Sequence, residues 1–171
     1  TACRIAMLIA LDEAQKSIDR ITQILHKKGI VAIPTDTIYG LAVDGTDEDA
    51  VKKLSDLKQR KDRPFAYFMK RGDIEKYAVV TKGKIIDFFL PGPLTIILRR
   101  KPDVVLPMVG EKIGIRIPNH NFVLRLLQTY PRPLCVSSAN ISGEPHLVSP
   151  YDIVEHLTAV DLVIDAGTLY A

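Results

Sequence analysis

Residues 30–41 read IVAIPTDTIYGL, in which four apolar residues are followed by a proline and three small polar residues. The apolar run is typical of a strand that is buried on both faces. In open α/β sheets ligands bind where strands end, and the hydroxyls of Thr35 and Thr37 project to the same side of an extended chain. The segment fits either a site for a small polar ligand or a turn in which Asp36 and the threonines cap local amides. Taken alone, it favours the turn.

Helices and apolar strands alternate around this segment, although not in strict order, which predicts an α/β or α+β domain with a mixed sheet flanked by helices. We expect helices to begin at Asp12, near Thr46 and Asp49, and at Ser149, and the first long helix to end at Gly29. The strands are predicted over residues 4–9, 30–33, 65–69, 94–98, 114–117, 134–136 and 162–164. The helices are predicted over residues 12–28, 50–57, 83–90, 121–130 and 150–157, with a short one starting at residue 73.

The composition is that of an ordinary globular protein, with 171 residues of which 47% are hydrophobic and 25% charged. This length suits one domain, which we place over residues 1–171. The net charge of +3 is too small to indicate a partner. Two distant cysteines, Cys3 and Cys135, argue against a disulfide scaffold or zinc ribbon and predict a cytoplasmic protein. No apolar run is long enough to span a membrane, and the four histidines show no metal-ligand spacing, so no metal held by side chains is predicted.

Residues 52–64, KKLSDLKQRKDRP, carry six Lys and Arg residues against two Asp, a local charge of +4. Apolar residues occupy the preceding helix, so Lys58, Arg60 and Arg63 fall at its C-terminal end and in the following loop. Lysine supplies a mobile point charge and arginine a planar fork, a combination that suits polyphosphate, while the lack of a Gly-rich loop excludes a P-loop. A solvated face whose cations complement the helix dipole, or a contact with nucleic-acid phosphates, also explains the cluster.

Arg116 lies between two isoleucines of a predicted strand, and a buried arginine needs an anionic partner because stranding its charge is costly. That partner is either an aspartate of the protein or the carboxylate or phosphate of a ligand. After Val136, residues 137–143 read SSANISG, whose small hydroxyl and amide groups can bind phosphate oxygens. A polar loop with Asx and Ser turns explains them slightly better. Cys135 is expected to pack in its apolar strand rather than act as a nucleophile.

Together these segments resemble the YrdC (TsaC) family, the threonylcarbamoyl-adenylate synthases, from about Lys28 to Gly167. The resemblance implies a YrdC-like twisted mixed β-sheet flanked by helices, with a concave basic cleft. It implies a nucleotidyltransferase that makes threonylcarbamoyl-AMP and pyrophosphate from L-threonine, bicarbonate and ATP. A partner complex then uses the product to modify the adenosine beside the anticodon of certain tRNAs. The matching blocks, in the family's order, are PTDTIYGL, LKQRKDRPFAYFM, PGPLTIIL, GIRIPNH and SSANISGEP.

The resemblance also implies roles for residues. Lys58 and Arg60 are the expected catalytic residues, with Mg²⁺ across the phosphates, because two anions approach each other only when cations neutralise them. Thr35, Thr37, Arg116 and Val136 are expected to bind L-threonine, with Arg116 on its carboxylate. The residues expected to bind ATP are Lys58, Arg60, Arg63, Lys112, Ser138 and Asn140.

Two departures from the family pattern stand out. Lys61 follows Arg60 where the family usually has proline, which is delayed here to Pro64, so Arg63 is expected to substitute for a neighbouring contact. The chain also stops at IDAGTLYA, where family members usually continue into a further strand, which we expect to be trimmed or disordered.

Two other functions stay open at this point. One is a non-catalytic module that binds tRNA or double-stranded RNA through its basic face, without a membrane partner. The other is a carbamoyl-adenylate-handling domain of the kind found in hydrogenase maturation factors, which usually brings zinc-finger and acylphosphatase modules with it.

Overall fold

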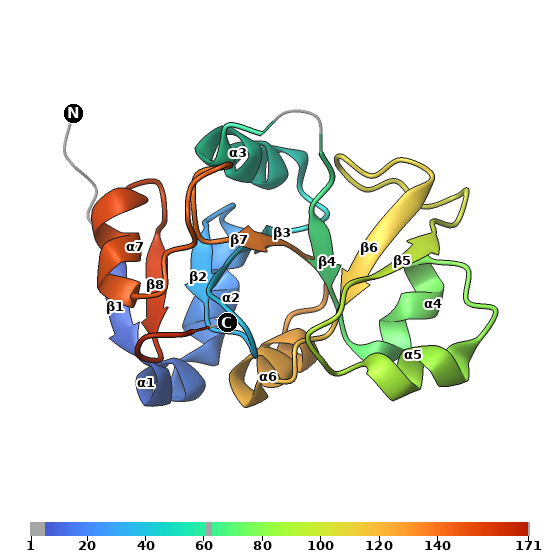
Figure 1. Ribbon diagram of the computed structural model, residues 1–171, viewed down its shortest axis with the longest axis horizontal. Coiled ribbons are helices and arrows are strands. Elements are labelled where there is room, and N and C mark those ends of the chain that lie inside the picture. The colour runs from blue at the N-terminus through green and yellow to red at the C-terminus, as the bar shows by residue number, and fades with distance from the viewer. Residues whose placement is uncertain (1–5, 61–62, 171) are drawn as a thin grey trace.

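The computed structural model describes residues 6–60 and 63–170, which form an eight-stranded mixed sheet with helices packed against it (Figure 1). This arrangement confirms the predicted fold class. The strand order is β1-β8-β2-β3-β7-β4-β6-β5, so β1 and β5 form the two edges. The strands are β1 Met7–Ala10, β2 Val31–Ile33, β3 Gly40–Asp44, β4 Ala66–Phe68, β5 Ile96–Arg99, β6 Lys112–Arg116, β7 Leu134–Ser138 and β8 Leu162–Asp165.

The helices cover the sheet in groups. α2 packs against β2, β3 and α6, α3 packs against β3, and α7 packs against β8 and β1. In Figure 1, α4 and α5 lie at the β5 end of the molecule and α1 and α7 at the β1 end. The helices are α1 Leu11–Lys16, α2 Ile18–His26, α3 Glu48–Lys58, α4 Ile74–Tyr77, α5 Gly83–Phe89, α6 Asn121–Thr129 and α7 Pro150–His156, with a 3₁₀ turn at Arg71–Asp73 before α4.

Strand pairing brings distant polar segments onto the central strands. The turn of residues 34–39 joins β2 to β3, which are antiparallel. β3 is also antiparallel to β7, and Gly40 lies opposite Ser138, so the turn lies beside the end of β7. β4 pairs with both β7 and β6, and Phe68 lies opposite Arg116. The polar ends of three predicted segments therefore meet near the middle of the sheet.

The first predicted helix is wrong in its details. It is two helices, α1 and α2, separated at Ser17, and Asp12 lies inside the first turn of α1 instead of capping it. The left-handed residue at the end of α2 is Lys28, with φ of 62°, and not Gly29. Gly29 is required for a different reason, because an added Cβ would lie 2.5 Å from Cγ2 of Ile24.

The other two predicted caps have different outcomes. The capping residue of α3 is Asp47, whose side chain accepts a hydrogen bond of 3.0 Å from the amide of Ala50. The predicted pair of Thr46 and Asp49 is therefore wrong by one position. Ser149 does cap α7, since its side chain accepts a hydrogen bond from the amide of Tyr151.

The wholly buried strand β3 was not predicted, because it follows the turn directly and ends on a charged residue, Asp44. Asp44 is 1% exposed and is satisfied on both oxygens. Oδ1 accepts hydrogen bonds from Thr46, and Oδ2 accepts hydrogen bonds of 2.7 Å from Tyr130 and 2.5 Å from Arg132. Burial alone would raise the pKa of Asp44, but these hydrogen bonds and the Arg132 charge hold it below its usual value.

None of the helices in the described ranges combines the length and the apolarity that crossing a bilayer would demand.

Candidate functional site

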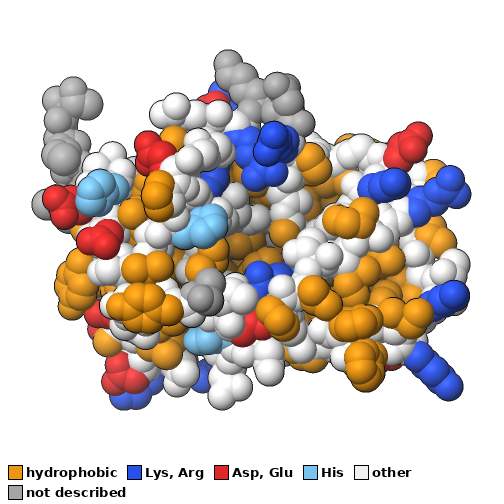
Figure 2. All heavy atoms as spheres, in the orientation of Figure 1, with side chains coloured by type: hydrophobic (Ala, Val, Ile, Leu, Met, Phe, Trp, Pro, Cys, Tyr) orange, Lys and Arg blue, Asp and Glu red, His pale blue; other side chains and the backbone are white. Residues whose placement is uncertain are grey.

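Two pockets adjoin one another on the central strands, and both are lined by Ser138. The larger, which we call the cationic pocket, has a volume of about 480 Å³. Figure 2 shows Lys and Arg side chains gathered near the end of α3, over this part of the face. Its lining residues are Lys58, Gln59, Arg60, Arg63, Ser138, Asn140, Ser142 and Gly143.

The smaller pocket, which we call the small pocket, has a volume of about 130 Å³. It lies against the turn of residues 34–39 and the strands β4, β6 and β7. Its lining residues are Thr35, Thr37, Ile38, Tyr39, Gly40, Ala66, Phe68, Thr95, Arg116, Val136, Ser137 and Ser138.

Lys58 is the last residue of α3 and is only 1% exposed. Its Nζ donates hydrogen bonds of 2.7 Å to the carbonyl of Ser138 and 2.5 Å to Oδ1 of Asn140, both neutral acceptors. Burial first, and the charge of Arg60 second, lower the pKa of Lys58 to about 8. Among the described residues no carboxylate forms an ion pair with it. A buried cation held only by neutral groups is prepared to bind an anion.

Arg60 adds a second positive charge, and no carboxylate of the described residues forms an ion pair with it. Its Nη2 donates a hydrogen bond of 2.8 Å to the carbonyl of Pro64, and its guanidinium lies 5.0 Å from the ring centroid of Phe65. Its Nε is buried without a hydrogen-bond partner in the described part of the chain. Burial, and next the charge of Arg63, lower the pKa of Arg60. The described lining of the cationic pocket therefore holds three cations and no carboxylate side chain, which suits a polyanion.

The loop after β7 is tied to the end of α3. The amide of Ser142 donates a hydrogen bond of 3.2 Å to the carbonyl of Lys58. The side-chain amide of Asn140 accepts from Lys58 and from the hydroxyl of Ser138, and donates to the carbonyl of Glu144 at 2.7 Å. These contacts hold the Ser138 and Asn140 side chains in place before any ligand arrives.

The turn of residues 34–39 caps itself, as one of the two alternatives predicted, and its ligand-binding role stays a prediction. Thr35 caps the turn, since its hydroxyl donates to the carbonyl of Ile38 at 2.7 Å and accepts from the amide of Thr37. The two threonine hydroxyls lie 3.1 Å apart and line the small pocket. Self-capping therefore places two hydroxyls at the pocket wall.

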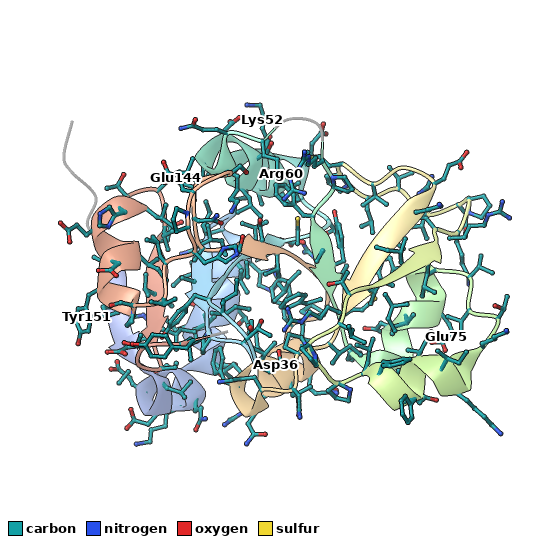
Figure 3. All side chains as sticks on the ribbon, in the orientation of Figure 1. Asp36, Lys52, Arg60, Glu75, Glu144 and Tyr151 are labelled. Carbon is teal, nitrogen blue, oxygen red and sulfur yellow. The ribbon has the colours of Figure 1, made fainter. Side chains whose placement is uncertain are left out.

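Arg116 has an aspartate partner. Its Nη2 donates hydrogen bonds of 2.6 Å to Oδ1 of Asp36 and 2.9 Å to the hydroxyl of Thr37. The other carboxylate oxygen of Asp36 accepts from the amide of Asn119, next to the start of α6, where Figure 3 labels Asp36. Arg116 also lines the small pocket, and its Nε is buried without a partner among the described residues. The guanidinium is thus fixed on one side and retains hydrogen-bonding capacity on another.

The structure brings together every predicted ligand-binding residue except Lys112. Val136 lines the small pocket and Arg63 the cationic pocket. Lys112 begins β6, whereas Arg116 ends it, about 13 Å further along an extended strand. It lines another hollow near the β5 edge, with Arg99 and Glu111, and neither of the two pockets, so its assignment to the nucleotide site stays a prediction. Lys61 lies outside the described residues.

Several lining residues were not predicted. Gln59 could have been found, since it stands between two predicted cations, whereas Phe68 and Thr95 read as ordinary strand residues. Tyr39 is buried, donates a hydrogen bond of 2.8 Å to the carbonyl of Gly167 and accepts one from the amide of Ala166. Tyr39, at the end of the turn of residues 34–39, therefore fastens the C-terminal segment beside the small pocket.

The remaining predictions concern a nucleophile and a metal. Cys135 is fully buried, and burial raises the pKa of its thiol, so the prediction that it packs is confirmed. Across the described ranges, no group of three or more His, Cys, Asp or Glu side chains could hold a metal ion.

Comparisons with known proteins point to a single family. A family model for the Sua5, YciO and YrdC proteins, described as telomere recombination, matches residues 23–171. A Methanocaldococcus jannaschii protein, provisionally named a threonylcarbamoyl-AMP synthase, is 40% identical over 162 residues, which cover 91% of this chain and 76% of the relative. The threonylcarbamoyl-AMP synthase of Mus musculus is 33% identical over 150 residues, or 85% of this chain.

Among solved structures, Pyrococcus abyssi Sua5 in complex with L-threonine superimposes with a TM-score of 0.84 at 27% identity and covers 96% of this chain. The chain spans only 54% of the mouse relative and 51% of the Pyrococcus abyssi protein.

Proposed function

The chain belongs to the Sua5/YciO/YrdC family, and we propose that it makes L-threonylcarbamoyl-AMP from L-threonine, bicarbonate and ATP with release of pyrophosphate. The observation that carries this proposal is the pair of adjoining pockets, one with three cations and one with Arg116, that share Ser138. A reaction that joins a nucleotide to an amino acid needs two sites that meet at one point.

In this proposal the triphosphate of ATP occupies the cationic pocket, with its α-phosphate beside Ser138 and Lys58. Lys58 takes up a phosphate oxygen readily because its other contacts are neutral and its charge is not yet balanced. Arg60 and Arg63 stabilise the negative charge that accumulates on the departing pyrophosphate.

The described lining of the cationic pocket offers hydroxyl and amide oxygens but no carboxylate, so it does not fit a Mg²⁺ ion held by the protein. We therefore assign no step to a metal and expect Mg²⁺ to enter only as a companion of the nucleotide phosphates.

L-threonine occupies the small pocket, with its carboxylate on Arg116 and its hydroxyl and amine near Thr35 and Thr37. The volume of about 130 Å³ suits a small side chain. The buried Nε of Arg116 has no partner in the described structure and supplies the hydrogen bond that a ligand carboxylate needs.

The chemistry then follows from position and charge. The amine of threonine attacks the carbon of bicarbonate, water leaves, and an N-carboxylate forms. An oxygen of this carboxylate attacks the α-phosphorus of ATP, the bond to the pyrophosphate oxygen breaks, and pyrophosphate departs. Since both reactants are anions, cations at the junction are the main contribution of the protein.

The product is a mixed anhydride, which water hydrolyses, so a second enzyme has to use it promptly. We propose that a tRNA-modifying complex in the cytoplasm takes the threonylcarbamoyl group, as the family resemblance of the sequence implies.

Pyrophosphate release, measured with ATP and each of the twenty amino acids in the presence and absence of bicarbonate, tests the proposal. We expect release only with L-threonine and bicarbonate together. Pyrophosphate release that does not require L-threonine, or does not require bicarbonate, would exclude the reaction. A requirement for carbamoyl phosphate would indicate the carbamoyl-adenylate alternative, and salt-sensitive RNA binding without release would indicate the RNA-binding alternative.

A further inference from the structure

Gln59 has a backbone conformation that its side chain does not favour. It follows Lys58 at the end of α3 with φ of 51° and ψ of 40°, in the left-handed region. Residues with a Cβ are disfavoured there, and glycine is the usual choice at the end of a helix. The helix end itself needs only backbone hydrogen bonds, from the amide of Gln59 to Asp56 and from the amide of Arg60 to Ser55. Glycine would make both, so the glutamine side chain requires another explanation.

The left-handed turn separates the directions of two neighbouring side chains. Lys58 is buried and reaches the floor of the cationic pocket at β7, whereas Gln59 is exposed and lines the same pocket at its rim. If the triphosphate binds at the floor of the cationic pocket, the base of the nucleotide therefore lies near the rim. Figure 3 labels Arg60 after α3 and Glu144 in the loop after β7, the two segments that border this pocket.

The polar groups on the floor are already engaged with one another. Asn140 uses its amide oxygen for Lys58 and Ser138, and its amide nitrogen for the carbonyl of Glu144. The side chain of Gln59, by contrast, makes no hydrogen bond within the described structure. Among the described lining residues it presents the uncommitted amide, which is uncharged and carries a donor and an acceptor side by side.

We propose that Gln59 selects the base of the nucleotide, by pairing its amide with the amino group and an adjacent ring nitrogen of adenine. This inference rests on the proposed use of ATP. Glutamine pairs with adenine in this two-bonded way. Guanine presents two acceptors at the corresponding edge, so the carbonyl of Gln59 would face an acceptor and the pairing would fail.

Steady-state pyrophosphate release with L-threonine and bicarbonate tests this pairing with three nucleotides: ATP, GTP, and purine riboside triphosphate, which lacks the 6-amino group. For the unaltered chain we expect kcat/KM for ATP to exceed that for each of the other two by about tenfold. In Gln59→Ala and Gln59→Gly the advantage of ATP over the analogue should vanish. A preference that survives in Gln59→Ala would overturn the proposal, and so would an unaltered chain that does not distinguish the three nucleotides.

Thermal unfolding of the same variants separates base selection from the ending of the helix. Of these two substitutions, only glycine adopts the left-handed backbone conformation without strain, so Gln59→Gly should have a melting temperature no lower than that of Gln59→Ala. Both variants should nevertheless lose the preference for ATP equally. If selectivity instead followed the melting temperature, Gln59 would act through the fold alone and the proposal would fail.

Lys28→Gly is the matched control, since Lys28 is the left-handed residue at the end of α2 and lines neither pocket. It should leave the nucleotide preference unchanged. Failure of the proposed function can be distinguished from failure of the Gln59 proposal, because in the first case no nucleotide would support threonine-dependent pyrophosphate release in the unaltered chain.

Discussion

At the scale of single residues, the site consists of charges whose partners are neutral or shared. Lys58 is held by a backbone carbonyl and an amide oxygen, and Arg116 shares its guanidinium between Asp36 and the small pocket. Each of these side chains is positioned before a ligand arrives, which reduces the ordering that binding would require. Three predictions follow from these charges and from the buried carboxylate of Asp44.

ATP affinity should depend on pH through Lys58. Its pKa of about 8 means that the ammonium loses its proton as the pH rises past 8, so ATP binding should weaken by up to about tenfold per pH unit above that value. Titration calorimetry from pH 7 to 9.5 measures this, with Lys58→Arg as the control, because arginine stays charged over that range. An equally steep decline in Lys58→Arg would contradict the assignment.

Arg116→Ala should raise the KM for threonine at least tenfold while ATP binding persists, because a carboxylate contact is lost. The change also strands Asp36, whose side chain is 12% exposed, and should lower stability by about 1–3 kcal/mol. The double variant Arg116→Ala with Asp36→Asn removes that stranded charge, so it should regain stability without regaining threonine affinity. A double variant that binds threonine normally would remove Arg116 from its proposed role.

Asp44→Asn should destabilise the fold by about 1–3 kcal/mol at pH 7, since Asp44 is buried and accepts from Tyr130 and Arg132. The pKa of Asp44 is lowered in the folded state, so its contribution is complete above the unfolded pKa of about 3.9 and is lost as pH falls through the folded value. The difference in thermal unfolding between the two proteins should therefore begin to shrink below about pH 4 and continue to shrink as the pH falls through the folded pKa of Asp44. A constant difference down to pH 2 would contradict this linkage.

At the scale of elements, the sequence predicted what is periodic and missed what is irregular. The apolar runs of β2 and β7 and the amphipathic faces of α2 and α6 were predicted because burial leaves a pattern in the residues. β3 was missed because it has no alternation and follows a turn directly. The split between α1 and α2 was missed because a half-buried serine carries no obvious signal for a break.

In the candidate site, too, some features were predicted from the sequence and others were not. Lys58, Arg60 and Ser138 were predicted from local chemistry and from family resemblance, and they converge on one pocket. The pairing of Arg116 with Asp36 could not be chosen over a ligand partner, because the contact joins residues on different elements far apart in the chain. Lys112 lines a separate hollow, so its assignment to the nucleotide site stays a prediction, because a cation near a strand gives no information about which pocket its side chain faces.

The fastening of the C-terminal segment by Tyr39 is a prediction at this scale. Tyr39→Phe removes the hydroxyl that bonds Gly167 and Ala166, so it should cost about 1 kcal/mol locally. Amide hydrogen exchange should accelerate at Ala166 and Leu169 while the β2–β3 pairs remain protected. Unchanged exchange at those two amides would show that the hydroxyl does not fasten the segment.

At the scale of the whole molecule, sheet order makes the site. The turn after β2, the end of β7 and the end of β6 come from distant parts of the chain, and they meet because β3, β7, β4 and β6 are neighbours in the sheet. The two resulting pockets share Ser138, so a nucleotide and an amino acid bound in them would touch.

Mass spectrometry of the product formed from ATP, L-threonine and ¹³C-labelled bicarbonate tests this union most directly. We predict one adenylate that contains threonine, AMP and a single labelled carbon, formed together with pyrophosphate. An adenylate of threonine without the label, or labelled material without threonine, would contradict the claim that the two pockets join a carboxylated amino acid to a nucleotide.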